Sequence, residues 1–218
     1  MRAPLTSRTR GRPAPRAAAR ALSMCAAVAA VAACVSSPAT TTTTTSSPAP
    51  AAGGGAVAVT IARGGATATL RDRAGATVGT ARILENADGT VRLVVHVDSM
   101  TPGTHGIHFH AVGSCTPGDS TAFAAAGPHY NPAARKHGLD NPDGPHAGDL
   151  PNLTVAAGGA GDLDVVTNRV TLRPGPTSLL DADGSALVVH AGTDDQRTDP
   201  SGNSGARAAC GVITAGGR

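Results

Sequence analysis

The part of the chain after residue 55 is predicted to be an all-β domain, an antiparallel sandwich or barrel. Short segments rich in Val, Thr and Ile alternate there with turn signals, many of them glycines. No stretch of this part repeats its apolar residues with a sustained helical period. Frequent short strands joined by Gly-rich turns are typical of antiparallel sandwiches and barrels.

Eight segments are expected to form strands. Residues 86–89, Asn-Ala-Asp-Gly, separate two of them as a hairpin turn would. Val91, Leu93, Val95 and Val97 alternate with other residues, which places them on one face of a strand. The expected strands are residues 56–62, 66–71, 77–84, 90–98, 104–112, 163–172, 186–191 and 206–214.

A long segment from Gly113 to about Ala160 breaks this rhythm, because no convincing strand is found in it. A loop of that length in a small domain is either functional or a sign of a wrong assignment. The segment contains His129, His137, His146 and Asp149. Metal ligation would explain how so long a loop stays ordered.

Residues 1–33 have the layout of a secretory signal. They carry six arginines and no acidic residue, and an apolar run that is too short to span a membrane as a stable helix follows. The run ends in Val-Ala-Ala-Cys at Cys34, which resembles the bacterial lipobox. This resemblance implies export, lipidation at Cys34 and anchoring to the outer face of the bacterial cell membrane. The alternative is an ordinary signal peptide with an incidental cysteine.

Residues 34–55 are rich in Ser, Thr, Pro and Gly, a composition that cannot bury a core and predicts a flexible tether. Residues 56–218 remain as one domain. The whole chain has 18 basic and 15 acidic residues, and without residues 1–33 it keeps 12 basic residues and a net charge of −3. This balance leaves no basic surplus that would predict nucleic-acid binding.

Two cysteines, Cys115 and Cys210, fall within the predicted domain. A pair of cysteines in an exported domain suggests one disulfide, and two buried free thiols are the alternative.

Three of the eight histidines suggest a first metal cluster. His108 and His110 are two residues apart, so on a strand they project from the same face as a chelating pair. His190 ends another expected strand and can join them from elsewhere in the sheet. Several imidazoles suit copper, zinc or nickel, and a tetragonal set of nitrogens favours copper(II).

A second cluster is predicted in the long loop. His129, His137, His146 and Asp149 supply three imidazoles and one carboxylate, which complete a closed tetrahedral zinc site. A closed site has a structural role because no position is left for substrate. For any one of these histidines alone, a solvated loop residue is the alternative.

Six motifs, in order along the chain from about residue 57 to 214, resemble the copper/zinc superoxide dismutase family. They are Gly-Ile-His-Phe-His at 106–110, Gly-Pro-His-Tyr-Asn-Pro at 127–132, Arg-Lys-His-Gly at 135–138, His-Ala-Gly-Asp-Leu at 146–150, Leu-Val-Val-His at 187–190 and the closing segment 202–213.

The resemblance implies a ligand set and several further roles. It implies copper on His108, His110, His129 and His190, and zinc on His129, His137, His146 and Asp149, so that His129 bridges the two metals. Asp194 is implied to link copper and zinc ligands from outside, and Arg207 to guide the substrate. Cys115 and Cys210 are implied to form the disulfide. His105 is expected to be structural, and His96 to be an exposed strand residue.

The family also implies a Greek-key, immunoglobulin-like sandwich or flattened barrel and the dismutation of superoxide to oxygen and hydrogen peroxide. The chain departs from the eukaryotic pattern in having Cys115 only five residues after His110 and no Glu- and Lys-rich cluster before Arg207. Whether the protein is a monomer or a homodimer stays open. The alternatives are a non-catalytic copper-binding or copper-delivery protein on the same fold, a zinc-stabilised surface module, and a copper-only variant.

Overall fold

The computed structural model describes residues 65–118 and 121–216, which all belong to the second of the two units into which the chain divides, Gly55–Arg218. The predicted signal, the tether with Cys34 and the expected strand at 56–62 lie outside the described residues. None of the helices among the described residues has the length and apolar character needed to cross a membrane.

The described residues form ten strands and one short 3₁₀ helix. They are β1 (Gly65–Asp72), β2 (Thr77–Glu85), β3 (Val91–Val97), β4 (Gly103–His105), β5 (Ile107–His110), η1 (Ala124–Ala126), β6 (Leu153–Val155), β7 (Gly161–Thr167), β8 (Ala186–His190), β9 (Arg207–Val212) and β10 (Thr214–Ala215).

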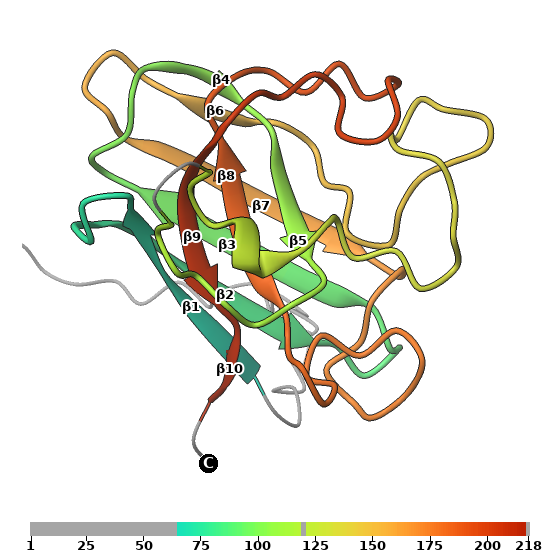
Figure 1. Ribbon diagram of the computed structural model, residues 1–218. Coiled ribbons are helices and arrows are strands. Elements are labelled where there is room, and N and C mark those ends of the chain that lie inside the picture. Colours follow the sequence, from blue (N-terminus) through green and yellow to red (C-terminus); the bar gives the residue numbers. More distant parts are fainter. Residues whose placement is uncertain (1–64, 119–120, 217–218) are drawn as a thin grey trace, which may run out of the picture. The chain divides into compact units, whose positions relative to one another are not determined.

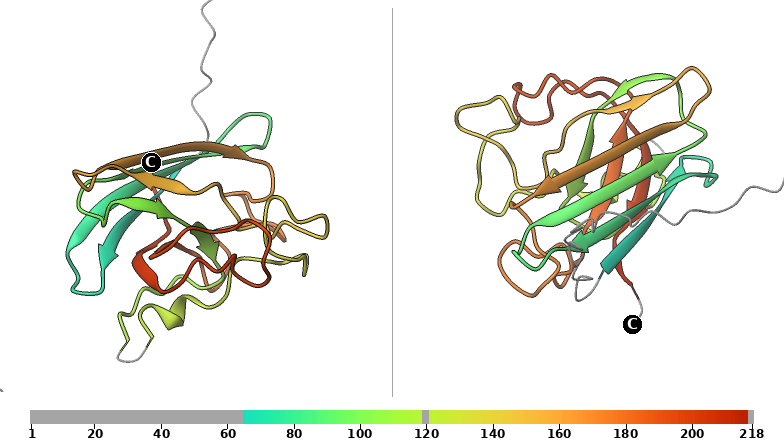
Figure 2. Two further views of the ribbon diagram at one scale, coloured as in Figure 1. Left: turned by 90° about the horizontal axis from the view of Figure 1, so that it is seen from above. Right: turned by 180° about the vertical axis from the view of Figure 1, so that it is seen from behind.

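The strands pair antiparallel in the order β4-β6-β7-β3-β2-β1-β9-β8-β5, with β10 paired to β1. This single sheet folds over on itself, so that β5, β8 and β9 lie in front of β2, β3 and β7 (Figure 1). The view from above in Figure 2 shows the two layers edge-on. The predicted all-β antiparallel sandwich is confirmed.

Most of the expected strands are present, and the turn at 86–89 joins β2 to β3. There the amide of Asn86 donates to the carbonyl of Thr90 at 2.8 Å, and Gly89 has a φ of 85°, which favours glycine. Strand β7 begins and ends earlier than the expected strand at 163–172, since it covers Gly161–Thr167. Strand β6 was not expected, because three residues paired to β4 are too few to show an alternating pattern.

The core lies between the two layers and is built mainly from aliphatic side chains. The predicted inward face of β3 is confirmed, since Val91, Leu93, Val95 and Val97 are all fully buried. Phe109 packs into the same cluster from the opposite layer. Burying such side chains contributes about 1.5–3 kcal/mol each, before the cost of chain entropy.

Strand β5 carries core residues on one face and histidines on the other. Ile107 and Phe109 point into the core, so the period of two sends His108 and His110 to the outer face of the sheet. All four are completely buried. The outer face of β5 is therefore covered, and the covering segments must come from the long loops beside it.

The backbone of the long loop covers the open edge of β5. The amide of Phe109 donates to the carbonyl of Gly148 at 2.9 Å, and the amide of Tyr130 donates to the carbonyl of Phe109 at 2.8 Å. A Cβ on residue 148 would lie 2.4 Å from the Phe109 carbonyl oxygen, so only glycine fits there. This docking places His129 beside His110.

Candidate metal centre

Four imidazoles meet on the outer face of β5 and β8. Donor atoms of His108, His110, His129 and His190 all lie within 4.8 Å of one another. Nδ1 of His108 and Nε2 of the other three are buried and have no hydrogen-bond partner among the described residues. An unpaired buried polar atom is costly, so four converging on one point fit a bound metal ion.

A second group converges on one carboxylate oxygen beside the first. Oδ1 of Asp149 lies 3.2 Å from Nδ1 of His129, 3.0 Å from Nδ1 of His137 and 3.3 Å from Nδ1 of His146. Donors about 2.0–2.2 Å from a tetrahedral ion are about 3.3–3.5 Å apart, so these distances are close to, and slightly shorter than, the spacing of zinc ligands. The other oxygen of Asp149 accepts the amide hydrogens of Gly138 and His146.

The tightest four-residue grouping around Asp149 differs from the predicted one. Within 4.8 Å of one another lie donor atoms of His108, His129, His137 and Asp149, without His146. His108, however, directs Nε2 to Asp194 at 2.7 Å, while its Nδ1 belongs to the first cluster. Nδ1 of His146 has no hydrogen-bond partner among the described residues, although it faces Asp149.

Asp194 links the two clusters from outside. Its Oδ2 lies 2.7 Å from Nε2 of His108, and its Oδ1 lies 3.0 Å from Nε2 of His137. The Asn152 side chain fixes the backbone of Asp194, donating to its carbonyl at 2.9 Å and accepting its amide at 3.0 Å. Carboxylates in such positions orient the imidazoles and raise their basicity.

Backbone carbonyls lie beside the outer nitrogens of His110 and His190, two histidines of the first cluster. Nδ1 of His110 lies 2.9 Å from the Gly127 carbonyl, and Nδ1 of His190 lies 3.2 Å from the Gly205 carbonyl. Because a carbonyl only accepts, each ring carries its hydrogen on Nδ1 and leaves the lone pair of Nε2 free.

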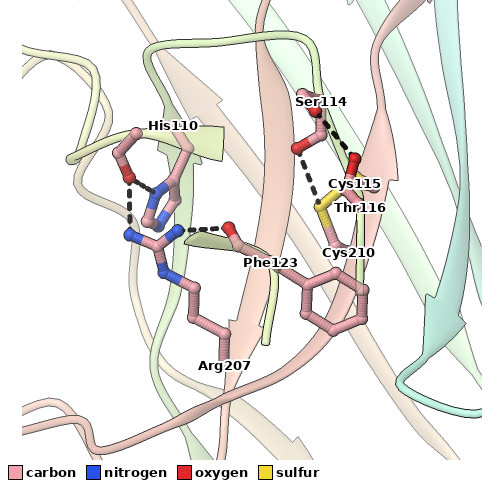
Figure 3. Close-up of a disulfide and its surroundings, with 8 residues drawn as sticks. His110, Ser114, Cys115, Thr116, Phe123, Arg207 and Cys210 are labelled. Atoms are coloured by element: carbon pink, nitrogen blue, oxygen red, sulfur yellow. Dashed lines mark hydrogen bonds between the residues drawn. A yellow bond between two sulfur atoms is a disulfide. The ribbon is translucent and has the colours of Figure 1, made fainter. Parts of the chain in front are cut away.

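Arg207 lies beside this cluster and shares a carbonyl with it (Figure 3). Its guanidinium donates to the carbonyls of Gly127 and Phe123, and the Gly127 carbonyl is also the one that faces His110. Burial lowers the pKa of the Arg207 guanidinium, but its ordinary pKa is so high that the charge is kept at neutral pH.

The predicted disulfide is present. Cys115 and Cys210 are bonded, which ties the start of the long loop to β9, as Figure 3 shows. Phe123 and Cys210 pack in a small apolar cluster on the outer side of β8. The segment from Cys115 to Gly127 therefore carries one cysteine of the disulfide and the two carbonyls that accept from Arg207.

Burial sets the charge of the four imidazole rings of the first cluster. It lowers the pKa of His108 to about 3 and that of His190 to about 4, and it also lowers the pKa of His110 and of His129. These four rings are neutral at pH 7 and present free lone pairs.

Charge in the group around Asp149 is arranged differently. Burial opposes a charge on His137, but hydrogen bonds to Asp149 and Asp194 outweigh it and raise the pKa of His137 to about 9. Burial likewise opposes the charge of Asp149, whereas hydrogen bonds from three histidines hold its pKa far below 3.8.

The two remaining histidines, His105 and His96, lie outside both clusters. His105 is buried, and its ring nitrogens lie 2.7 Å from the His190 carbonyl and 2.8 Å from the Thr101 carbonyl. His96 is exposed on β3 and pairs with Asp162 at 2.7 Å.

Sequence reasoning missed the residues that fasten the segment after His190 to the long loop. Besides Asn152, the Gln196 side chain donates to the Leu150 carbonyl at 3.1 Å and accepts the Leu139 amide at 3.3 Å. A Cβ on Gly202 would lie 1.7 Å from Oδ1 of Asp194, so glycine is required. The family resemblance at Asp194 and in the closing segment pointed to this region but not to these residues.

Together, the fold and the two adjoining clusters define a β-sandwich metalloprotein with a buried, histidine-rich metal centre. Residues 77–213 match the family described as copper/zinc superoxide dismutase.

Relatives with known names and structures agree with this match. The chain is 45% identical over 142 residues to the Cu-Zn superoxide dismutase of Caulobacter vibrioides, covering 64% of this chain and 79% of that protein. It is 42% identical over 146 residues to the superoxide dismutase-like protein YojM of Bacillus subtilis, covering 66% and 73%. The crystal structure of a SOD-like protein from Bacillus subtilis is similar with a TM-score of 0.61 and 41% identity, covering 68% and 97%.

The chain therefore belongs to the copper/zinc superoxide dismutase family. It is a superoxide dismutase, and its cofactors are copper and zinc.

Proposed function

We propose that the protein dismutates superoxide at a copper ion bound by His108, His110, His129 and His190, and that a histidine bridge joins this ion to a structural zinc ion. The observation that carries the proposal is the position of His129. Its Nδ1 lies 3.2 Å from Asp149 in one cluster, and its Nε2 is one of the four unpartnered nitrogens of the other. One ring thus serves both clusters.

The zinc ion is assigned to His129, His137, His146 and Asp149. His146 is preferred to His108 because its unpartnered Nδ1 faces Oδ1 of Asp149 at 3.3 Å, as do the Nδ1 atoms of the other two histidines. His108 has each of its nitrogens engaged elsewhere, one in the copper cluster and one with Asp194. Four protein ligands close the site, which suits a structural role.

Copper, when bound, supplies the one-electron chemistry by which two superoxide ions and two protons become oxygen and hydrogen peroxide. The chain must attract the anion and deliver the protons. Arg207 offers a permanent charge and a fork of donors beside His110. Two carbonyls hold the guanidinium in place, so little reorganisation is needed when the anion arrives.

His129 is the group that can carry a proton to the product. Its Nδ1 is engaged on the zinc side, which fixes the ring, while Nε2 is directed into the copper cluster. We infer that Nε2 takes up a proton during the cycle and releases it to the peroxide. His108 and His110 are fully buried, whereas His129 is 6% exposed, so the first two are poorer routes for protons from solvent.

We further propose that residues 1–33 direct export and that Cys34 is lipidated, so that residues 34–55 tether the domain of residues 56–218 to the outer face of the bacterial cell membrane. The support is the basic, then apolar sequence that ends in Val-Ala-Ala-Cys. Mass spectrometry of the membrane fraction should find the mature N-terminus at Cys34 with a lipid mass added. A soluble product cleaved elsewhere would contradict this.

The proposed function is tested by metal content and superoxide dismutase activity measured on the same purified protein. One copper and one zinc per chain are expected, with activity abolished in His190→Ala and retained in His96→Ala, which removes an exposed histidine outside both clusters. Both metals without activity would indicate a copper-binding or copper-delivery protein instead. A protein that binds zinc but no copper would instead be a zinc-stabilised structural module.

A further inference from the structure

The outer nitrogen of each metal-site histidine has a carbonyl or carboxylate beside it, with the exception of His129, whose two nitrogens belong to the two clusters. For His108, His110, His137 and His190, the partners lie at hydrogen-bond distance. His146 is different, because its Nε2 lies 3.8 Å from Oδ1 of Asp199. The Asp199 carboxylate faces this ring at the rim of the site, beyond hydrogen-bond distance.

Asp199 makes three contacts around the proposed zinc ligands. Its Oδ1 accepts the amide hydrogen of His137 at 2.8 Å and is the atom that faces Nε2 of His146. Its Oδ2 accepts from Nζ of Lys136 at 3.1 Å. The carboxylate thus fixes the backbone of one zinc ligand and faces the ring of another.

Asp199 also stands between the zinc cluster and solvent. The side chain of His146 is only 7% exposed, whereas that of Asp199 is 36% exposed and that of Lys136 is 59% exposed. His146 and Asp199 both line a surface pocket of about 640 Å³, which His129 also reaches. Asp199 therefore lies on the solvent-facing side of two of the histidines that surround Asp149.

The chemistry of a zinc-bound imidazole makes this contact matter. A ring bound through Nδ1 keeps its hydrogen on Nε2, and that hydrogen then points to the nearest acceptor. For His146 the carboxylate that faces Nε2 is that of Asp199. A carboxylate in this position orients the ring and raises its basicity, and removal of such partners typically costs about 10- to 100-fold in metal affinity.

We propose that Asp199 is a positioning residue of the zinc site, which holds the ring of His146 in place and slows the release of zinc into the pocket. The proposal rests on the assignment of zinc to His146 made above and adds to it a residue that determines zinc retention. It concerns the zinc half of the centre alone, because Asp199 contacts His137 and His146 and none of the copper-cluster residues.

The test uses the protein loaded with both metals and measures zinc loss to a colorimetric chelator. Asp199→Asn keeps the shape of the side chain and an oxygen for the His137 amide, but removes the charge that faces His146. We expect zinc to leave about 10-fold faster, within the range above, and copper to leave at the wild-type rate. With cobalt in place of zinc, the visible absorption of Asp199→Asn should shift, because the field at His146 changes.

Two further variants separate this role from loop stability. Asp140→Asn removes a carboxylate of the long loop that pairs with Arg197 at 3.5 Å, and it should match the wild type in both readouts. Lys136→Met leaves Asp199 free to engage His146 and should not speed zinc loss.

The proposal is overturned if Asp199→Asn loses zinc within twofold of the wild-type rate. It is equally overturned if Lys136→Met loses zinc as fast as Asp199→Asn, since the ion pair would then be what matters. A wild-type protein that holds no zinc at all would instead contradict the zinc assignment itself and this inference with it.

Discussion

Nδ1 of His129 lies 3.2 Å from Oδ1 of Asp149, while Nε2 of the same ring points away into a second group of imidazoles. This geometry arises because the segment around His129 pairs with the edge of β5 at His110. The arrangement of the whole metal centre has five consequences that can be measured.

Tight binding of both copper and zinc should depend on Asp194. Because its two oxygens face His108 and His137, Asp194→Asn removes the charge that orients one ring of each cluster. We expect the affinity for copper and for zinc each to fall by about 10- to 100-fold, measured by competition with chelators. Asp195→Asn, in the neighbouring residue, should leave both affinities unchanged, and a loss confined to one metal would contradict the shared role.

Arg207 should act on the substrate and not on the metals. Arg207→Ala removes a fixed positive charge beside His110, so kcat/KM for superoxide should fall by about 10- to 1000-fold and depend less on ionic strength. Copper and zinc content should stay at the wild-type level. Arg207→Lys keeps the charge but not the forked set of donors, so its kcat/KM should lie between those of the wild type and Arg207→Ala. An Arg207→Ala enzyme with full activity would rule out this role.

The disulfide should support the site as well as the fold. Replacing Cys115 and Cys210 by serine frees the segment that carries the Phe123 and Gly127 carbonyls, which hold Arg207. The free energy of unfolding should fall by about 2–5 kcal/mol. We expect copper loss and falling activity at temperatures where far-ultraviolet circular dichroism still reports the native sandwich. Simultaneous loss of metal and strand signal would contradict this order.

Proton release should distinguish zinc binding from copper binding. In the metal-free protein the pKa of His137 is raised to about 9, so at pH 7.5 this ring is protonated and must lose a proton to bind zinc. The pKa values of His108 and His190, about 3 and 4, leave those rings neutral at the same pH. Calorimetry in buffers of different ionisation enthalpy should find at least one more proton released with zinc than with copper.

The same shifts fix the pH dependence of the metal-free protein. Between pH 6.5 and 4 the unfolded chain binds more protons at His108 and His190 than the folded chain, so stability should fall as the pH falls through this window. His137 acts in the opposite sense, because its contribution is present below pH 6.5 and is lost as the pH rises through about 9. Equal proton release with both metals, or stability that rises as the pH falls from 6.5 to 4, would contradict these charge states.

Much of the fold could be predicted because the alternation in strands such as β3 is a local signal. The histidine pair of β5 could be predicted for the same reason, since a spacing of two fixes a shared face. Strand β6 is too short to leave such a signal. The partners of Asp194 and His146 could not be read from spacing, because Asn152 and Asp199 lie more than 40 residues from them and meet them only through the packing of two loops.

The central claim is that His129 joins a copper ion to a zinc ion, and a crystal structure of the metal-loaded protein with anomalous data at the copper and zinc edges tests it most directly. We expect a copper peak at Nε2 of His129, shared with His108, His110 and His190, and a zinc peak at its Nδ1, shared with His137, His146 and Asp149. A single metal peak, or two peaks of which only one contacts His129, would contradict it.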